Sequence, residues 1–241
     1  MKKTRNLTQT VYSAVLDLML SGRLLPGQKL QFLDLAQKFK VSRTPVNIAL
    51  SMLAKDGFLR FTPNCGYVVN RLDRQEVVSL LAMKETLEQG FLPRAVTDVS
   101  EIDLFVVKGH MIECERAIAE KNDVRTLLAD LDFHFALLAP TGNLVLLESY
   151  RRLCHLLLVG YRLELLSFVD AARMVREHRL IFAALSDRDA ETFEQALATH
   201  WFLHGEECRQ VATRSGKGRS FSSEGQHLVT TALPQSVAVF Q

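Results

Sequence analysis

The spacing of apolar residues predicts three short helices near the N-terminus. The first runs from Asn6, which can cap a helix, to Gly22, which can end one. Its apolar stripe consists of Leu7, Val11, Ala14, Val15 and Leu18. The second helix is short and carries Leu33, Leu35, Ala36 and Phe39. The third begins after Ser42, a good N-cap residue, and its buried stripe is Val46, Ala49, Leu50 and Leu53.

Two β-rich runs, residues 58–61 and 67–69, follow the third helix around a turn that ends at Gly66, which predicts a hairpin. Three helices and a hairpin make a winged helix-turn-helix, whose third helix enters the DNA major groove. The side chains facing away from the apolar stripe of that helix are Arg43, Thr44, Asn47 and Ser51. Gly66 at the wing tip would let the backbone approach the sugar-phosphate chain. An ordinary helical core with a hairpin is the alternative.

Beyond the hairpin, the pattern changes to long helices. Gly and Pro become sparse after Tyr67, and helical stripes continue from Glu76 to about Val211, with breaks expected near residues 93–100, 121–123, 140–143, 168–171 and 186–189. This spacing predicts about six helices in an all-α bundle. The fold class is therefore mainly α, with a winged helix-turn-helix over residues 1–72 and a helical domain over residues 73–213. Residues 214–241 are Ser/Gly-rich at first, and we expect a disordered or lightly docked tail.

Charge is divided along the chain in the same way. Residues 1–72 carry 11 Lys/Arg against 3 Asp/Glu, a balance of +8, whereas the remainder carries 18 against 24, a balance of −6. A basic head on an acidic body indicates that one part meets a polyanion. The four cysteines form no CxxC pair, which disfavours a zinc ribbon or a disulfide framework. No apolar run approaches the roughly 20 residues of a membrane helix, so we expect a soluble cytoplasmic protein.

Several motifs resemble a known family. The runs Leu25-Pro26-Gly27, Ser42-Arg43-Thr44-Pro45-Val46 and Gly66-Tyr67-Val68 resemble the N-terminal domain of GntR-type bacterial transcription regulators, and the rest resembles the FadR-subfamily effector domain, FCD. The resemblance covers about residues 8–210. It implies a homodimer that binds a short palindromic DNA operator and responds to a small effector.

The resemblance also assigns DNA contacts by position. Arg43 and Thr44, which follow Ser42 in the motif, match the DNA-contacting residues of the family, and Gly66 matches its wing-tip glycine. Asn47 stands where the family usually has Arg. Because Asn pairs with adenine and Arg favours guanine or phosphate, this departure predicts an altered operator.

A cluster of metal-ligating residue types lies on predicted inner helix faces. Asp130 and His134 are i and i+4, His178 lies between Met174 and Ile181, and His200 is in register with apolar neighbours. Imidazole with carboxylate suits a divalent ion of the Zn, Ni or Mn class. Hydrogen-bonded core histidines are the alternative. The FCD resemblance implies that Asp130, His134, His178 and His200 are metal ligands; Asn143 also fits its pattern, and His204 is a candidate substitute.

The resemblance further implies a small carboxylate effector that touches the metal. Lys84 precedes Glu88 at the spacing where the family frequently has Arg, and Arg162 is a second candidate cation. Both could instead be ordinary surface charges. The sequence thus predicts a DNA-binding repressor whose operator binding is modulated by a small carboxylate at a metal site.

Two alternatives remain from the sequence, a metal-sensing regulator and a metal-dependent enzyme. An enzyme would need an acid or base beside the ion, for which Asp132 and Glu177 are nearest, although Glu177 is expected to face partly away. The sequence has no Gly-rich phosphate loop and no GxSxG nucleophile turn. We therefore expect no enzymatic activity.

Overall fold

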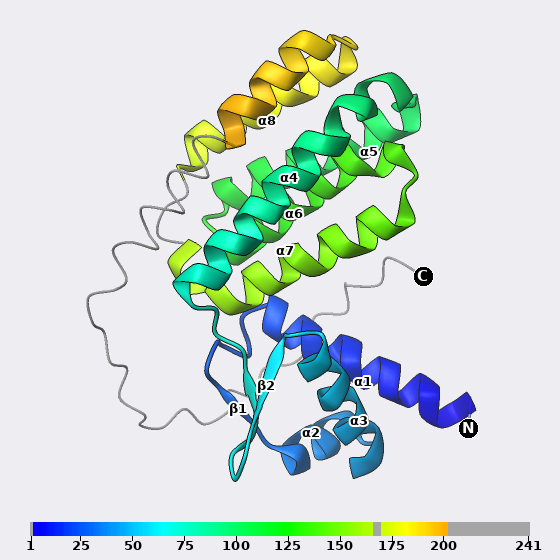
Figure 1. The fold of residues 1–241 in the computed structure, drawn as a ribbon, viewed down its shortest axis with the longest axis vertical. Helices are drawn as coiled ribbons and strands as arrows, with labels where there is room; N and C mark the ends of the chain where they lie inside the picture. The colour runs from blue at the N-terminus through cyan, green and yellow to red at the C-terminus, as the bar shows by residue number, and fades with distance from the viewer. Residues whose placement is uncertain (1, 166–169, 202–241) are drawn as a thin grey trace.

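The computed structural model describes residues 2–165 and 170–201 (Figure 1). A small N-terminal head, which contains the sheet, is followed along the chain by a bundle of long helices. The predicted tail at 214–241 and His204 lie outside the described residues. Among the described helices, none is long and apolar enough to cross a membrane.

The head is a winged helix-turn-helix. Its elements are α1 (Lys2–Leu20), β1 (Lys29–Leu30), α2 (Phe32–Phe39), α3 (Arg43–Lys55), β2 (Leu59–Thr62) and β3 (Gly66–Val69). The predicted hairpin is present as β2 and β3, paired from Leu59 opposite Val69 to Thr62 opposite Gly66. Strand β1 adds a third antiparallel strand on the other side of β3, so the sheet order is β1-β3-β2.

Helix α3 forms as its sequence pattern predicts. Val46, Ala49, Leu50 and Leu53 are fully buried in the core of the head. Ser42 occupies the N-cap position, but its side chain makes no capping hydrogen bond. Pro45 lies in the first turn, where a missing N–H costs no intrahelical bond. Lys40 adopts a left-handed conformation that ends α2 and redirects the chain into α3.

The bundle contains long helices with polar caps. They are α4 (Arg74–Asp98), α5 (Glu101–Ala119), α6 (Asp123–Leu138), α7 (Leu144–Leu165) and α8 (Ala171–Ser186), with a short 3-10 turn at Ala139–Thr141 and a last helical segment over residues 190–201. Asp73 and Ser100 form capping boxes at the starts of α4 and α5. The mainly α fold class is confirmed.

The break expected near residues 93–100 lies at the C-terminal end of that range, at Val99 and Ser100. Helix α4 continues through Pro93 to Asp98, although proline removes a backbone donor inside a helix. Leu92, Ala95 and Val96 on either side of Pro93 are buried in the bundle core. We infer that this packing outweighs the local cost of the proline, because burial of one large apolar side chain contributes about 1.5–3 kcal/mol.

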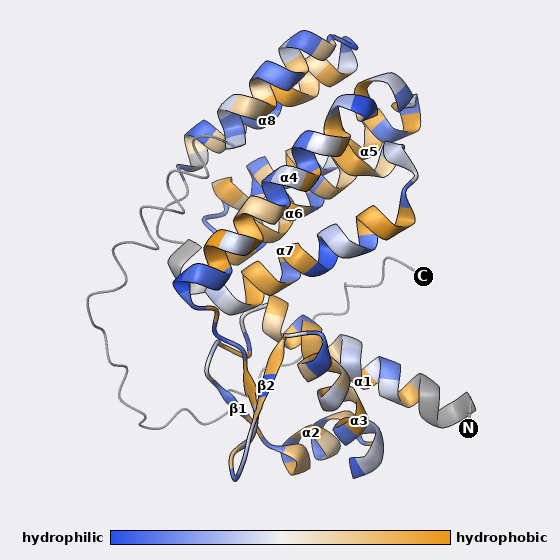
Figure 2. Ribbon diagram, in the orientation of Figure 1, coloured by the Kyte–Doolittle hydropathy of each residue, from blue (hydrophilic) through white to orange (hydrophobic). Residues whose placement is uncertain are grey.

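Helix α7 joins the head to the bundle, and the hydropathy colouring shows apolar segments along it (Figure 2). Val159 of α7 belongs to the buried core of the head, with Leu156 packed against it. The carbonyl of Gly160 accepts a hydrogen bond from the Leu72 amide at 3.2 Å, and a Cβ at Gly160 would lie 2.5 Å from Leu72 Cγ. A glycine is therefore required for this close approach.

Candidate functional site

The side chains predicted to contact DNA share the exposed side of α3. Ser42, Arg43, Thr44, Asn47 and Ser51 are all exposed. Gly66 begins β3 with φ +81°, a conformation that favours glycine. The structure thus leaves these residues accessible on the head.

The same side of α3 carries two apolar residues that the sequence analysis did not single out. Ile48 is 43% exposed and Met52 is 36% exposed. Their positions directly after Asn47 and Ser51, outside the buried stripe of α3, were the available signal. In a major groove such a side chain can contact the methyl group of thymine.

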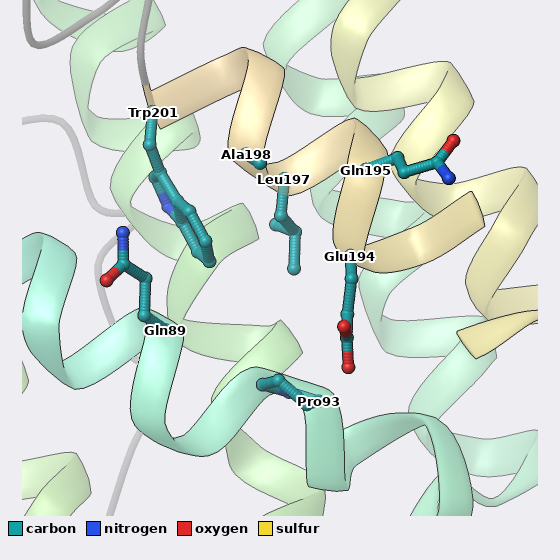
Figure 3. A pocket seen from close by; sticks show the side chains of 7 residues that line it. All are labelled: Gln89, Pro93, Glu194, Gln195, Leu197, Ala198 and Trp201. Atoms are coloured by element: carbon teal, nitrogen blue, oxygen red, sulfur yellow. The ribbon is translucent and has the colours of Figure 1, made fainter. Parts of the chain in front are cut away.

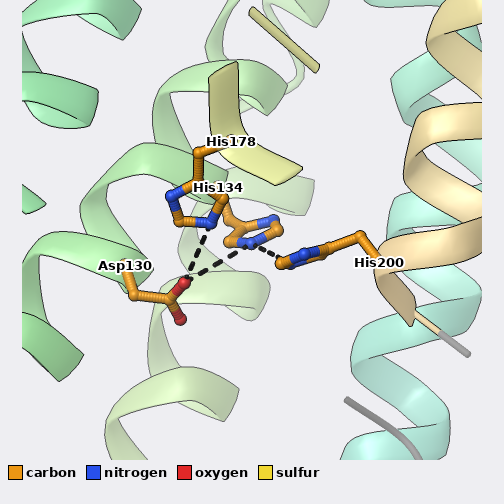
Figure 4. Close-up of side chains that lie close together, drawn as sticks. All are labelled: Asp130, His134, His178 and His200. Atoms are coloured by element: carbon orange, nitrogen blue, oxygen red, sulfur yellow. Dashed lines mark hydrogen bonds and ion pairs between the residues drawn. The ribbon is translucent and has the colours of Figure 1, made fainter. Parts of the chain in front are cut away.

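The predicted metal ligands converge in the bundle (Figure 4). Asp130 and His134 come from α6, His178 comes from α8, and His200 comes from the segment 190–201. The three imidazoles are 0–2% exposed, so the cluster is buried except at the Asp130 carboxylate. The i, i+4 spacing on α6 explains the first pair, and the packing of three separate helices supplies the rest.

The separations of the donor atoms suit one divalent ion. Asp130 Oδ1 lies 3.2 Å from His178 Nε2 and 3.8 Å from His134 Nε2. His134 Nε2 and His200 Nε2 are 2.9 Å apart, and one donor atom from each of the four residues lies within 4.8 Å of the others. Adjacent ligands on an ion with bonds of about 2.1 Å are separated by roughly 3.0–3.4 Å. The cluster could therefore close on an ion with small shifts.

Two glutamates contact the Nδ1 atoms of two of the histidines. His200 Nδ1 lies 2.8 Å from Glu177 Oε2, and His134 Nδ1 lies 3.2 Å from Glu88 Oε1. A carboxylate in this position favours a proton on Nδ1 and leaves Nε2 with a lone pair. With both histidines in that tautomer, two lone pairs face one another across 2.9 Å. A divalent cation between the two Nε2 atoms would accept both lone pairs, and the donor set fits one.

His178 has different contacts from the other two histidines. Its ring stacks on Phe133, with centroids 4.1 Å apart and an interplanar angle of 23°. Its Nδ1 is buried with no hydrogen-bond partner among the described residues. Burial lowers the pKa of His178, and it lowers the pKa of His200 well below the usual value, with the neighbouring imidazoles adding to the effect. Both are therefore neutral near pH 7, the form that binds metals.

Glu88 is the centre of a second buried network. Lys84 Nζ donates to its Oε1 at 2.7 Å, and the Tyr150 hydroxyl and Trp201 indole also donate to its carboxylate. Burial alone would raise the pKa of Glu88, but Lys84 and His134 reverse this and lower it. The ionised carboxylate thus links Lys84 to the metal-type cluster through His134.

The other residues that the sequence analysis singled out differ in their exposure and contacts. Lys84 is partly buried beside the cluster rather than on the open surface. Arg162 lies within α7, but its side chain is outside the described residues. Asn143 is exposed, and its Oδ1 accepts a hydrogen bond from the Leu146 amide at the start of α7. Asp132 is exposed.

Sequence reasoning underestimated two glutamates. Glu177 was expected to face partly away, yet its side chain is buried and contacts His200. Its position next to His178 in a Glu-His pair was a usable signal. The function of Glu88 as a buried acceptor was signalled only by the Lys84 spacing, because the partners Tyr150 and Trp201 are distant in sequence.

A shallow groove lies beside this network (Figure 3). It has a volume of about 420 Å³ and runs between α4 and the segment 190–201. Its lining residues are Gln89, Pro93, Glu194, Gln195, Leu197, Ala198 and Trp201. Trp201 forms part of the wall and also donates to Glu88, so a single side chain separates the groove from the buried carboxylate.

A winged helix-turn-helix on a helical bundle with a buried polar site is the architecture of a ligand-responsive DNA-binding regulator. Two family matches agree with it. The gntR family of bacterial regulatory proteins matches residues 7–69, and the FCD domain matches residues 79–202. The chain belongs to this family and is a DNA-binding transcriptional regulator with an FCD domain; the family consists of regulators rather than enzymes.

The sequence identity to individual relatives is low. The chain is 26% identical to the transcriptional regulator YdhC of Bacillus subtilis over 210 residues, which cover 86% of this chain and 92% of that protein. It is 25% identical to the transcriptional repressor RspR of Escherichia coli over 211 residues, covering 86% and 91%. The solved structure of Escherichia coli McbR/YncC has a TM-score of 0.73 at 22% identity, covering 87% and 98%, and shows the same fold.

The exposed side of α3 generates the first prediction. Arg43→Ala should weaken binding to DNA from the chain's own upstream region by about 5- to 150-fold, because a base-contacting Arg contributes about 1–3 kcal/mol. Fluorescence anisotropy at fixed salt measures the change. Arg94→Ala removes the same charge from an exposed position of α4 and should leave binding unchanged. Equal affinities for the two variants would remove α3 from DNA recognition.

The second prediction concerns Glu177. Glu177→Gln should lower divalent-ion affinity by roughly 10- to 100-fold, because the carboxylate that orients His200 loses its charge. Competition against a chromophoric chelator measures the affinity. Glu194→Gln, an exposed change one turn before Ala198, is the matched control and should bind the ion normally. Unaltered affinity in Glu177→Gln would show that the carboxylate does not tune the ligand.

Proposed function

We propose that this regulator is a repressor whose operator affinity is set by a small carboxylate bound at a divalent ion held by Asp130, His134, His178 and His200. The supporting observation is the pair of Nε2 atoms that face each other at 2.9 Å with carboxylates behind them. Residues 1–72 would bind the operator and residues 73–213 the effector. The repressor assignment is supported by two relatives, RspR and a probable D-xylose utilization operon repressor of Paenarthrobacter nicotinovorans.

The proposed DNA contacts are Ser42, Arg43, Thr44 and Asn47 on α3, with Gly66 at the wing. Residues at the start of a recognition helix reach both phosphates and base edges. Asn47 would read adenine by a two-point hydrogen bond. A homodimer would present two copies of α3 to the two halves of a palindromic site.

A bound ion of the Zn, Ni or Mn class would supply open coordination positions for carboxylate oxygens. Lys84 is the cation placed to hold the same ligand, because its ammonium already lies beside the cluster. A carboxylate there would compete with Glu88 for Lys84. Arg162 on α7 stays a second candidate.

Helix α7 offers a physical route from this site to the head. In its second turn, Tyr150 donates to Glu88. Within the next three turns, Arg152 donates to the Asp56 carbonyl at 3.0 Å and Gly160 accepts from Leu72. Asp56 Oδ2 also accepts from the Tyr12 hydroxyl of α1 at 2.8 Å. A shift of α7 would therefore move the contacts that position the head, which is the linkage the proposal requires.

A metal-sensing regulator is the second candidate. It is favoured by the completeness of the protein donor set, three buried imidazoles and one carboxylate, which can saturate a tetrahedral ion without an effector. In that case the ion alone would change operator affinity.

The third prediction separates these candidates. Operator affinity is measured by anisotropy for the apo protein, for protein loaded with Zn²⁺, Ni²⁺ or Mn²⁺, and for loaded protein with malonate or succinate. The proposal expects a change of 5- to 150-fold on adding a carboxylate, the usual range for allosteric coupling of 1–3 kcal/mol. A full response to the ion alone supports the sensor instead. Lack of any response contradicts both.

Lys84→Gln is the diagnostic variant for the carboxylate. It should bind operator and metal like the wild type and respond less to the acid, because it loses the charge beside the ion. Metal content and helical circular dichroism control for damage to the Glu88 network. A wild-type response in this variant would exclude Lys84 from effector binding.

A further inference from the structure

The outer face of α5 exposes large apolar side chains. Ile102 is 76% exposed, Phe105 78%, Val106 43% and Ile112 51%. They lie opposite the buried side of the helix, which includes Val107, Met111 and Cys114. Their spacing places them along one stripe about 15 Å long, at a rise of 1.5 Å per residue. No described residue of the chain covers this stripe enough to bury it.

Gly109 lies in the middle of this stripe. It is exposed, and a Cβ added there would meet no atom within 4 Å. A glycine inside a helix costs roughly 0.5–1 kcal/mol relative to alanine. The described part of the chain therefore gives no packing reason for this glycine. A close approach from outside the chain would supply one.

The stripe is complementary to itself. A two-fold contact repeats the same patch on both partners, so residue i faces j and j faces i. Ile102 and Ile112 are equally far from position 107 along α5, and Phe105 and Gly109 are as well. If two copies of α5 cross antiparallel at that position, each Phe105 ring lies over the Gly109 of the other copy. The large ring then occupies the space that the glycine leaves.

We propose that this α5 face is the contact between two copies of the chain, with Phe105 packed on Gly109 at its centre. This inference rests on the proposed homodimer and names its surface. Apolar anchors at the centre and a charged rim are the usual anatomy of homodimer interfaces. The charged residues here have both signs: Lys108 lies beside the stripe, and Glu113 and Arg116 continue the same face beyond Ile112, so the face is not of one sign.

The location also suits a DNA-binding dimer. Helix α5 belongs to the bundle, and α3 belongs to the head at the other end of the molecule (Figure 1). Pairing through α5 leaves the exposed side of α3 free in both copies. Residues of the buried metal-type cluster lie on α6, α8 and the segment 190–201, so the contact does not use them.

Sedimentation equilibrium of the full chain tests this surface. Wild type should have twice the chain mass of 27.2 kDa at micromolar concentration. Phe105→Glu should weaken the dimer at least 100-fold, because it places two charges in the apolar centre. Leu180→Glu adds the same charge at an exposed apolar position of α8 and should stay dimeric.

Gly109→Leu is the sharper variant. Leucine favours a helix more than glycine, and the space around Gly109 is open, so the variant should keep the helical circular dichroism of the wild type. Its dimer should nevertheless weaken at least ten-fold, because the new side chain occupies the place of the Phe105 ring. A monomeric wild type, or an intact dimer in Phe105→Glu or Gly109→Leu, overturns the proposal.

A failure of the α5 contact can be distinguished from a failure of the proposed DNA-binding function. Arg43→Ala should remain a dimer while losing operator affinity, and Phe105→Glu should lose the two-site operator complex while retaining weak, salt-dependent binding to a half-site. If Phe105→Glu stays dimeric and binds operator normally, the proposed function stands and the α5 surface is wrong.

Discussion

Two imidazole nitrogens that face each other across 2.9 Å inside the bundle are the constraint on which the site depends. Glu88 and Glu177 lie beside the Nδ1 atoms of these two rings and favour a proton there. Buried lone pairs this close are unfavourable without a positive charge between them. Asp130 and His178 complete a donor set around the same point. The bundle therefore brings together, from three helices that are separate in sequence, a donor set that could hold a cation.

The site and the DNA-binding head share structural parts. Glu88 contacts the cluster through His134 and contacts α7 through Tyr150. Further along, α7 contributes Val159 to the core of the head. Because one helix packs in both cores, a rearrangement at Glu88 would have a direct route to the head. This continuity gives the proposed coupling a physical basis, and the close contact at Gly160 limits how far the two parts can slide.

Local sequence patterns were sufficient for the three helices and the hairpin of the head and for the inward faces of the bundle. The stripe of α3 and the i, i+4 pair Asp130 and His134 are set by helical periodicity, which a sequence displays directly. Strand β1 could not be predicted, because two residues carry no period and exist as a strand only through pairing with β3. The passage of α4 through Pro93 likewise depends on tertiary burial.

Some features of the candidate site were also predictable from the sequence, and others were not. The ligand types and their inward positions were readable, and the family resemblance joined them into one set. The inward turn of Glu177 and the four-partner network of Glu88 depend on helix packing, so the sequence indicated them weakly. The exposed apolar stripe of α5 was not predicted, because the exposure of Phe105 becomes visible only when the rest of the core is known.

X-ray absorption spectroscopy of the full chain, purified without added metal and then loaded with one equivalent of Zn²⁺, tests the central claim most directly. The account predicts a first shell of nitrogen and oxygen at about 2.0–2.2 Å with the multiple-scattering pattern of two or three imidazoles. A shell dominated by sulfur at about 2.3 Å, or by water oxygens without imidazole scattering, would contradict it.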